Sequence, residues 1–120
     1  MLCLHVKTFA HHGAAGRKLN TSLSFPLHSL DMRPYLSTTV LAQRYRLPTG
    51  ASATAPLLYD CVCVVVHKGS FQGGHYVAYV RNGDVWYLCD DAYVQHVAEE
   101  VVQQSQPYML FYEQRSTEAV

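Results

Sequence analysis

The dipeptide Asn82-Gly83 lies between two strand-like segments, and it constrains the fold more than any other feature of the chain. Asn-Gly between hydrophobic segments is the strongest short-range signal for a two-residue type I′ turn, which joins neighbouring antiparallel strands. The flanking residues 76–80 and 85–88 are rich in Tyr, Val and Trp, which favour strands. We therefore predict a β-hairpin that turns at Asn82-Gly83.

The predicted hairpin sets the partners of two titratable side chains. A turn at Asn82-Gly83 places Arg81 opposite Asp84 and, further along, His75 opposite Asp90. Directly opposed residues have Cβ atoms about 4.5–5.5 Å apart, close enough for a carboxylate to orient an imidazole. A three-residue turn that included Asp84 would instead place Asp91 opposite His75. The sequence thus predicts two members of a nucleophilic triad, a histidine and a carboxylate. It does not decide whether the carboxylate is Asp90 or Asp91.

A cross-strand His–Asp pair is also a common structural hydrogen bond. The glycines Gly73 and Gly74, directly before His75, favour a functional site instead. Paired glycines at the start of a strand allow another backbone to approach closely, as a substrate chain must.

Composition excludes several classes of protein. The chain has 120 residues, 49% of them hydrophobic and 15% charged, which indicates one folded domain or part of one rather than a disordered segment. Nine basic and nine acidic side chains balance, so we expect no nucleic-acid partner and no anionic membrane. No apolar run approaches the roughly 18 residues of a membrane helix, and the first residues do not resemble a signal peptide. We expect a cytoplasmic or nuclear location with reduced thiols.

The cysteines and histidines show no metal-binding pattern. No Cys-x-x-Cys pair occurs, and His11, His12, His28 and His67 lack the spacing of ligands. We therefore predict no metal and no cofactor. Two of the four cysteines, Cys61 and Cys63, lie two residues apart in an apolar run, so we expect them to share one strand face as small core residues.

The rest of the chain indicates an α+β domain with a mainly antiparallel sheet and one or two short helices. A long flexible loop is predicted over residues 38–56, where no periodic pattern occurs, and a polar tail over residues 114–120. The other predicted elements are strands over 2–7, 19–25, 61–66 and 107–112, one turn over 31–35, and a short helix over 97–104.

Five segments resemble, in order, the sequence motifs of the ubiquitin-specific proteases. They are a strand motif at 5–9, a segment at 25–36, a histidine box at 59–79, a Trp-x-x-x-(Asn/Asp)-Asp segment at 86–91 and a closing strand at 108–112. The resemblance covers almost the whole chain. It implies that residues 1–113 are the C-terminal part of the catalytic domain, the mainly antiparallel β-sheet half of a papain-like cysteine protease.

The same resemblance implies roles for the candidate residues. His75 is the base that takes a proton from the cysteine, and Asp90 is the carboxylate that orients it. Asp91 is a supporting polar group near the nucleophile and the oxyanion. Gly73 and Gly74 belong to a loop over the ubiquitin tail. Tyr76 lines the channel for that tail, or is a packed aromatic residue of the sheet.

One departure from the family pattern limits what the chain does alone. The family's nucleophile lies in a box of the form Asn-x-Gly-Asn-Thr-Cys, which does not occur here, and the zinc-finger cysteine pairs are absent as well. Cys89 precedes Asp90 but points to the opposite face of its strand, so we reject it as a substitute.

Two hypotheses follow. In the first, the chain contributes to thiol-dependent hydrolysis of isopeptide bonds at the ubiquitin C-terminus, its partners being ubiquitin or a ubiquitylated protein and an N-terminal segment that carries the cysteine. The isolated chain is then inactive. In the second, it is a truncated, non-catalytic module that binds ubiquitin or regulates another protein.

Overall fold

The structure is a computed structural model that describes residues 1–7, 9–12, 15–18, 22–48, 56–70 and 72–116. The strands are β1 (Leu2–His5), β2 (Phe9–His12), β3 (Ala15–Lys18), β4 (Leu30–Asp31), β5 (Leu58–Gly69), β6 (Gly74–Asn82), β7 (Val85–Asp90), β8 (Tyr93–Val97) and β9 (Met109–Gln114). The helices are the 3₁₀ turn η1 (Arg33–Tyr35), α1 (Ser37–Tyr45) and α2 (Glu99–Gln103).

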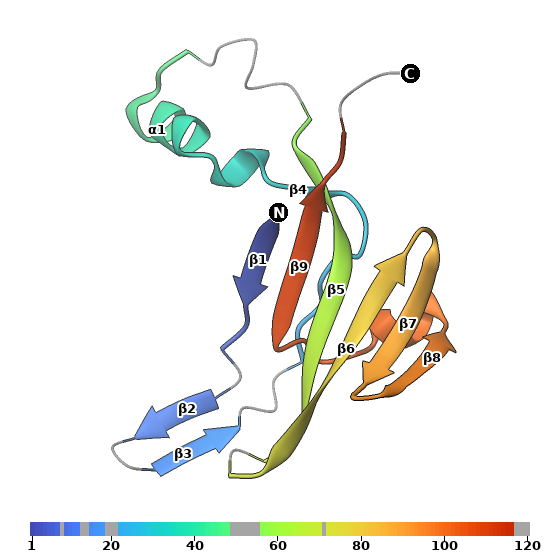
Figure 1. The fold of residues 1–120 in the computed structure, drawn as a ribbon. Coiled ribbons are helices and arrows are strands. Elements are labelled where there is room, and N and C mark those ends of the chain that lie inside the picture. Colours follow the sequence, from blue (N-terminus) through green and yellow to red (C-terminus); the bar gives the residue numbers. More distant parts are fainter. Residues whose placement is uncertain (8, 13–14, 19–21, 49–55, 71, 117–120) are drawn as a thin grey trace.

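Seven strands form one antiparallel sheet in the order β1-β9-β5-β6-β7-β8, with β4 pairing with β5 beside this path (Figure 1). Strands β2 and β3 form a separate hairpin. The prediction of an α+β class with a mainly antiparallel sheet and one or two short helices is therefore confirmed, and the described residues form two α-helices. Residues 22–25 were expected to be part of a strand but belong to none of the strands in the described part of the chain, and residues 19–21 lie outside that part.

The hairpin of β6 and β7 turns one residue later than predicted. Asn82 pairs with Val85, so the two loop residues are Gly83 and Asp84. Gly83 has a φ of 63°, whereas Asp84 does not have a positive φ, which is the pattern of a type II′ turn with glycine in first position. The predicted pairing of Arg81 with Asp84 is thus wrong, because Arg81 faces Trp86.

One face of the large sheet, here called the core face, holds the hydrophobic core. Its fully or almost fully buried side chains are Val64, Val66, Val77, Tyr79, Trp86, Leu110 and Tyr112. The irregular segment with Phe25 and Leu27 covers this face together with Val102 of α2. Hydrogen bonds fix that segment, since the Tyr112 hydroxyl donates to the Pro26 carbonyl at 2.7 Å and the Cys61 amide to the Leu27 carbonyl at 2.8 Å.

A β-bulge in β5 separates the two cysteines that were expected to share a face. Cys61 pairs with Tyr112 while Cys63 pairs with the next residue, Phe111, so β5 has one extra residue, Val62, at this point. The extra residue reverses the alternation of side chains. Cys61 is therefore fully buried on the core face, where burial raises the pKa of its thiol to about 11, and Cys63 lies on the other face.

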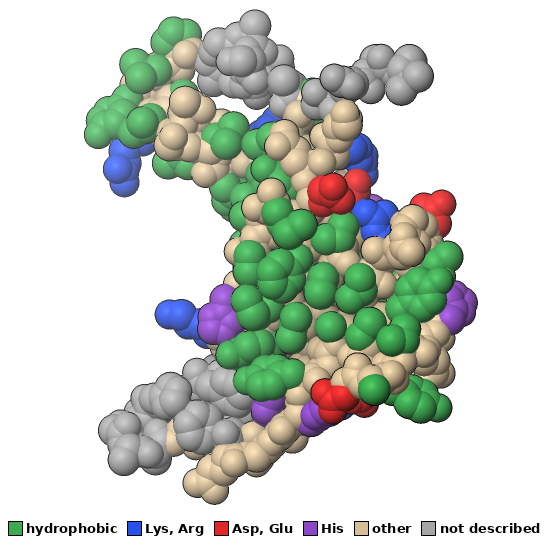
Figure 2. Space-filling model, viewed as in Figure 1, with side chains coloured by type: hydrophobic (Ala, Val, Ile, Leu, Met, Phe, Trp, Pro, Cys, Tyr) green, Lys and Arg blue, Asp and Glu red, His purple; other side chains and the backbone are tan. Residues whose placement is uncertain are grey.

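The opposite face of the sheet, here called the outer face, is also apolar but is only half-buried. It carries Cys63, Val65, Ala78, Val80, Cys89, Met109 and Phe111. Figure 2 shows hydrophobic side chains gathered over the centre of the sheet on the side viewed. When one face of an antiparallel sheet is in contact with water, the residues on that face are ordinarily polar. The outer face is therefore more apolar than a sheet face in contact with water ordinarily is.

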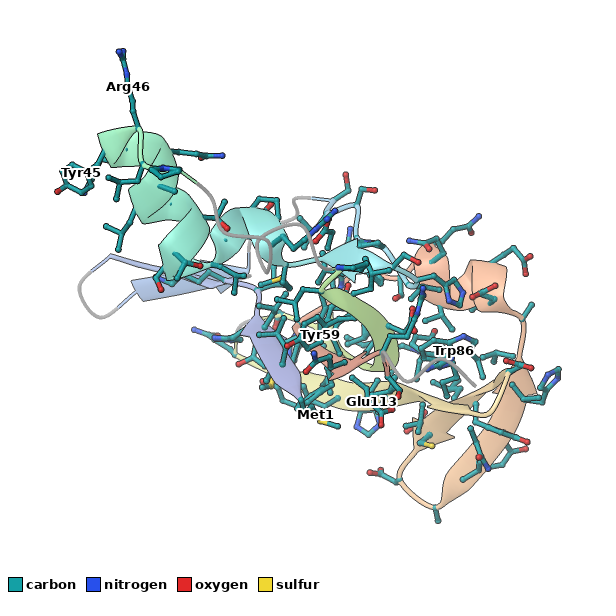
Figure 3. All side chains as sticks on the ribbon, turned by 90° about the horizontal axis from the view of Figure 1, so that it is seen from above. Met1, Tyr45, Arg46, Tyr59, Trp86 and Glu113 are labelled. Atoms are coloured by element: carbon teal, nitrogen blue, oxygen red, sulfur yellow. The ribbon has the colours of Figure 1, made fainter. Side chains whose placement is uncertain are left out.

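The region predicted as a loop over residues 38–56 contains a helix. Helix α1 ends where Arg46 adopts the left-handed conformation (φ 54°) and the Leu47 amide donates to the Ala42 carbonyl. Only Ala42 of this helix is buried, so its sequence has no stripe of apolar residues at helical spacing. The helix forms although the only sequence signal for it is the helix propensity of Ala, Gln and Arg. Figure 3 shows Tyr45 and Arg46 pointing away from the sheet. Residues 49–55 lie outside the described part of the chain. No helix among the described residues is long and apolar enough to cross a membrane.

The expected polar tail begins later than residue 114. Gln114 belongs to β9, and the Arg115 amide donates to the Leu58 carbonyl at 2.8 Å. The Arg115 guanidinium binds both carboxylate oxygens of Asp60, with Nη2 2.6 Å from Oδ1 and Nε 3.0 Å from Oδ2. These contacts hold the end of β9 against β5. Residues 117–120 lie outside the described part of the chain.

This ion pair predicts a loss of stability in acid. The hydrogen bonds from Arg115 lower the pKa of Asp60 from 3.8 to about 2. A depressed carboxyl pKa stabilises the fold above the unfolded pKa, and that contribution is lost as the pH falls from about 4 through 2. Because Arg115 is partly exposed, we expect a contribution of only about 1 kcal/mol at pH 7. Urea unfolding of Asp60→Asn and of the unmodified chain should give different free energies at pH 7 and converge near pH 2; a difference that does not change with pH would contradict this.

Candidate active site

His75 and Asp90 are brought together at one end of the β6–β7 hairpin. His75 Nε2–H donates to Asp90 Oδ1 at 2.5 Å. The two residues are not directly opposed as predicted, because the register is shifted by two residues relative to a turn at Asn82-Gly83. A shift of two leaves every side chain on the same face of the sheet. The pair is therefore a diagonal contact, within reach of long side chains.

Asp91 is the more distant of the two carboxylates. Its Oδ2 lies 3.9 Å from His75 Nε2, and its side chain is 83% exposed. Asp91 has a φ of 51° in the turn between β7 and β8, whereas Asp90 is the last residue of β7. The left-handed region is one that Asp tolerates better than most residues. Of the two carboxylates that the sequence left open, Asp90 therefore makes the hydrogen bond.

The site favours a protonated imidazole. The hydrogen bond from His75 to Asp90 and the charge of Asp90 raise the pKa of His75 above its ordinary value of 6.5. Asp91 adds to this effect, whereas partial burial and the charge of Lys68 oppose it. Because Nε2 is engaged by Asp90, Nδ1 is the ring nitrogen that remains to exchange a proton with another group.

A titration of the imidazole should show this effect directly. We expect NMR of the His75 ring to give a pKa above 6.5 in the unmodified chain and a lower pKa in Asp90→Asn, which removes the negative charge. The raised pKa stabilises the fold below pH 6.5, and this contribution is lost as the pH rises through the folded-state pKa. An unchanged pKa in Asp90→Asn would show that the carboxylate does not act on His75 in solution.

The two glycines before His75 differ in what surrounds them. A Cβ at Gly73 would meet nothing within 4 Å, so this glycine faces open space. A Cβ at Gly74 would lie 2.2 Å from His67 Nε2 and 2.6 Å from the Lys68 carbonyl oxygen. The space at Gly74 is thus filled by the chain's own His67, not left open to a foreign backbone as predicted. The Gly73 carbonyl accepts hydrogen bonds from the Ser70 amide at 2.7 Å and the Ser70 hydroxyl at 3.1 Å.

Tyr76 lies on the outer face, opposite to His75 and Asp90. Its side chain is half exposed, and its ring contacts those of His67 and Tyr108 at centroid distances of 4.8 and 5.3 Å. It therefore has the packing of a sheet aromatic residue and an exposed surface as well. Sequence reasoning missed both of its ring partners. The signal for His67 was its pairing with Tyr76, which becomes visible only once the β5–β6 register is known.

Two other expectations concern cysteines and metals. Cys89 pairs with Ala78 and lies on the face opposite to Asp90, which is the reason it was rejected as a nucleophile. Among the described residues, only His75, Asp90 and Asp91 form a group with ligand atoms close enough to hold a metal, all within 4.8 Å of one another.

Comparison with known proteins gives consistent matches over almost the whole chain. The family model described as ubiquitin carboxyl-terminal hydrolase matches residues 1–112. Ubiquitin C-terminal hydrolase 22 of Arabidopsis thaliana is 37% identical over 129 aligned residues, which cover 97% of this chain and 23% of that protein.

Solved structures agree with these sequence matches. A SAGA DUB module of Ubp8, Sgf11, Sus1 and Sgf73 bound to monoubiquitin is similar with a TM-score of 0.78 at 30% identity, covering 98% of this chain and 24% of that one. A yeast SAGA DUB module with an Sgf73 mutant gives a TM-score of 0.77 at 29% identity, covering 97% and 23%. The chain thus spans about a quarter of the length of these relatives.

Proposed function

Because this chain belongs to the ubiquitin carboxyl-terminal hydrolase family, we propose that it supplies the histidine base and the orienting aspartate of a thiol-dependent deubiquitinase. The observation that carries the proposal is the hydrogen bond of 2.5 Å between His75 and Asp90 at one end of the β6–β7 hairpin. A base oriented by a carboxylate is the arrangement that activates a thiol or hydroxyl nucleophile.

The nucleophile in this proposal is a cysteine on a segment outside the chain. Two observations support such a segment: the relatives are about four times longer, and the outer face is more apolar than a sheet face in contact with water ordinarily is. Residues 1–113 then form the C-terminal part of the catalytic domain, and its location is the cytoplasm or the nucleus.

The proposed reaction uses the two ring nitrogens of His75 for different tasks. Nε2 stays bound to Asp90, and Nδ1 takes the proton of the cysteine thiol. The thiolate attacks the isopeptide carbonyl carbon, and Asp91 lies near the oxygen that becomes negative. The protonated imidazole then gives its proton to the departing lysine amine as the carbon–nitrogen bond breaks. Water, deprotonated by the same imidazole, hydrolyses the resulting thioester and releases ubiquitin.

The substrate in this proposal is the C-terminal tail of ubiquitin. Relatives of known structure have been solved with monoubiquitin and with ubiquitin aldehyde, which supports ubiquitin as the partner. Gly73 leaves open space beside the site, and we assign it to the loop over the tail together with Gly74. The exposed half of Tyr76 is proposed to line the same channel.

The experiment that tests this function labels extracts of the source cells with a thiol-reactive ubiquitin probe and detects the chain with an antibody against residues 74–90. A labelled band well above 13.5 kDa, shifted by one ubiquitin, is expected. An unlabelled band only near 13.5 kDa would overturn the proposal and leave the non-catalytic module. In that case, titration of the chain with ubiquitin, followed by NMR, would show whether it binds ubiquitin without hydrolysis.

A further inference from the structure

We propose that His67 is a positioning residue for His75: its ring fills the space that Gly74 leaves and thereby fixes the backbone from which His75 reaches Asp90. The inference rests on the proposed function for its meaning in catalysis, whereas the contact itself is a property of this chain. It concerns a residue on the outer face, opposite to the side chain that it positions.

The first observation is the fit between His67 and Gly74. A Cβ on residue 74 would lie 2.2 Å from Nε2 and 2.5 Å from Cε1 of His67, well below any real contact distance of a Cβ. The imidazole therefore packs directly on the backbone of Gly74, which only glycine permits. His75 is the next residue, so a displacement at Gly74 moves the Cα of His75.

The second observation is that this end of β6 is supported on one side only. The ladder between β6 and β7 ends at Ala78 and Cys89, whereas the ladder between β5 and β6 continues to Gly69 and Gly74. Residues 74–77 are thus attached to β5 alone. Backbone pairing with one neighbour leaves such a segment freer to move than the middle of the sheet. Side-chain packing from β5 is what can hold it in place.

The third observation is a row of four rings that supports His67. His5 contacts Tyr108 at a centroid distance of 4.9 Å, Tyr108 contacts Tyr76 at 5.3 Å, and Tyr76 contacts His67 at 4.8 Å. These edge and tilted contacts are the arrangements that aromatic rings prefer. The row crosses the outer face from β1 to β5 and ends on Gly74. The row therefore links the position of His75 to the packing of β1, of the residue just before β9, and of β5.

The test is an NMR titration of the His75 ring in three variants of the chain. In His67→Ala we expect the pKa of His75 to fall towards that of Asp90→Asn, because the ring is no longer held beside the carboxylate. His67→Phe keeps a ring over Gly74 and should keep the pKa of the unmodified chain. His28→Ala is the matched control, since it removes an exposed histidine that pairs with Glu99, and it should change nothing.

An unchanged pKa in a folded His67→Ala chain would overturn the proposal. If that variant does not fold, the unmodified chain decides: nuclear Overhauser contacts between the His67 ring protons and the Gly74 α-protons are expected, and their absence would overturn it as well. No ubiquitin and no thiol take part in these measurements. Their failure would leave the proposed function standing, and failure of the ubiquitin probe would leave the positioning role standing.

Discussion

Replacing His75 with alanine, in a form of the protein that carries the cysteine segment, is expected to lower the hydrolysis of a ubiquitin amide by about a thousandfold or more. The loss has two physical sources. Without the imidazole the thiol keeps its proton near neutral pH, because its pKa returns towards about 8.5. The leaving amine also loses the acid that protonates it. The measurement is kcat/KM on ubiquitin with a fluorescent amide leaving group.

Two further variants make this prediction specific. Asp90→Asn keeps a side chain of similar shape but removes the charge that orients His75, so we expect a smaller loss than for His75→Ala. His96→Ala removes another exposed histidine, which lies on β8 and contacts Tyr87 instead of the site, and activity should stay within about twofold. Full turnover by His75→Ala would rule out His75 as the base.

Replacing Trp86 with alanine is expected to destabilise the fold by about 3–5 kcal/mol. Trp86 lies in β7, is 2% exposed and faces the side of the sheet that α2 covers (Figure 3). Its removal leaves a cavity that neighbours on a pleated sheet fill only partly. Because small domains have a total stability of about 5–15 kcal/mol, this loss brings the chain close to unfolding. Urea unfolding at pH 7 measures it.

The neighbouring residue provides the control for that experiment. Val85→Ala shortens a side chain that is 37% exposed on the other face of the same strand. We expect a destabilisation below about 1 kcal/mol, because little buried surface is lost. Equal unfolding midpoints for Trp86→Ala and Val85→Ala would show that the core face is not the stabilising side of the sheet.

The sequence predicted the candidate pair but not its register, and the reason is physical. A turn at Asn82-Gly83 pairs Tyr79 with Trp86, whereas the observed turn at Gly83-Asp84 pairs Tyr79 with Leu88. Both registers bury the same side chains, because side chains alternate with a period of two. The hydrophobic pattern therefore excludes a shift of one residue and says nothing about a shift of two.

Other features escaped prediction because they leave no period in the sequence. Helix α1 buries only Ala42, so no apolar stripe marks it. The bulge at Val62 lies in a run of β-branched and small residues. Such a run is compatible with either set of alternating residues facing the core, so the sequence does not mark the bulge. Strand β8 is an exposed edge strand, and its side chains do not alternate between buried and exposed. In each case burial was too slight or too uniform to produce a pattern.

The bulge in β5 also divides the thiols of this chain by chemical reactivity. Cys61 is buried on the core face, and its thiol has a pKa of about 11. Alkylating reagents that need the thiolate therefore do not react with Cys61 in the folded chain. Cys3 is exposed, and Cys63 and Cys89 are partly accessible. A reagent chosen only for its affinity for sulfur would therefore modify the folded chain on the outer face. One inserted residue thus places Cys61 on the core face and Cys63 on the outer face, so it decides which of these two thiols a reagent can reach.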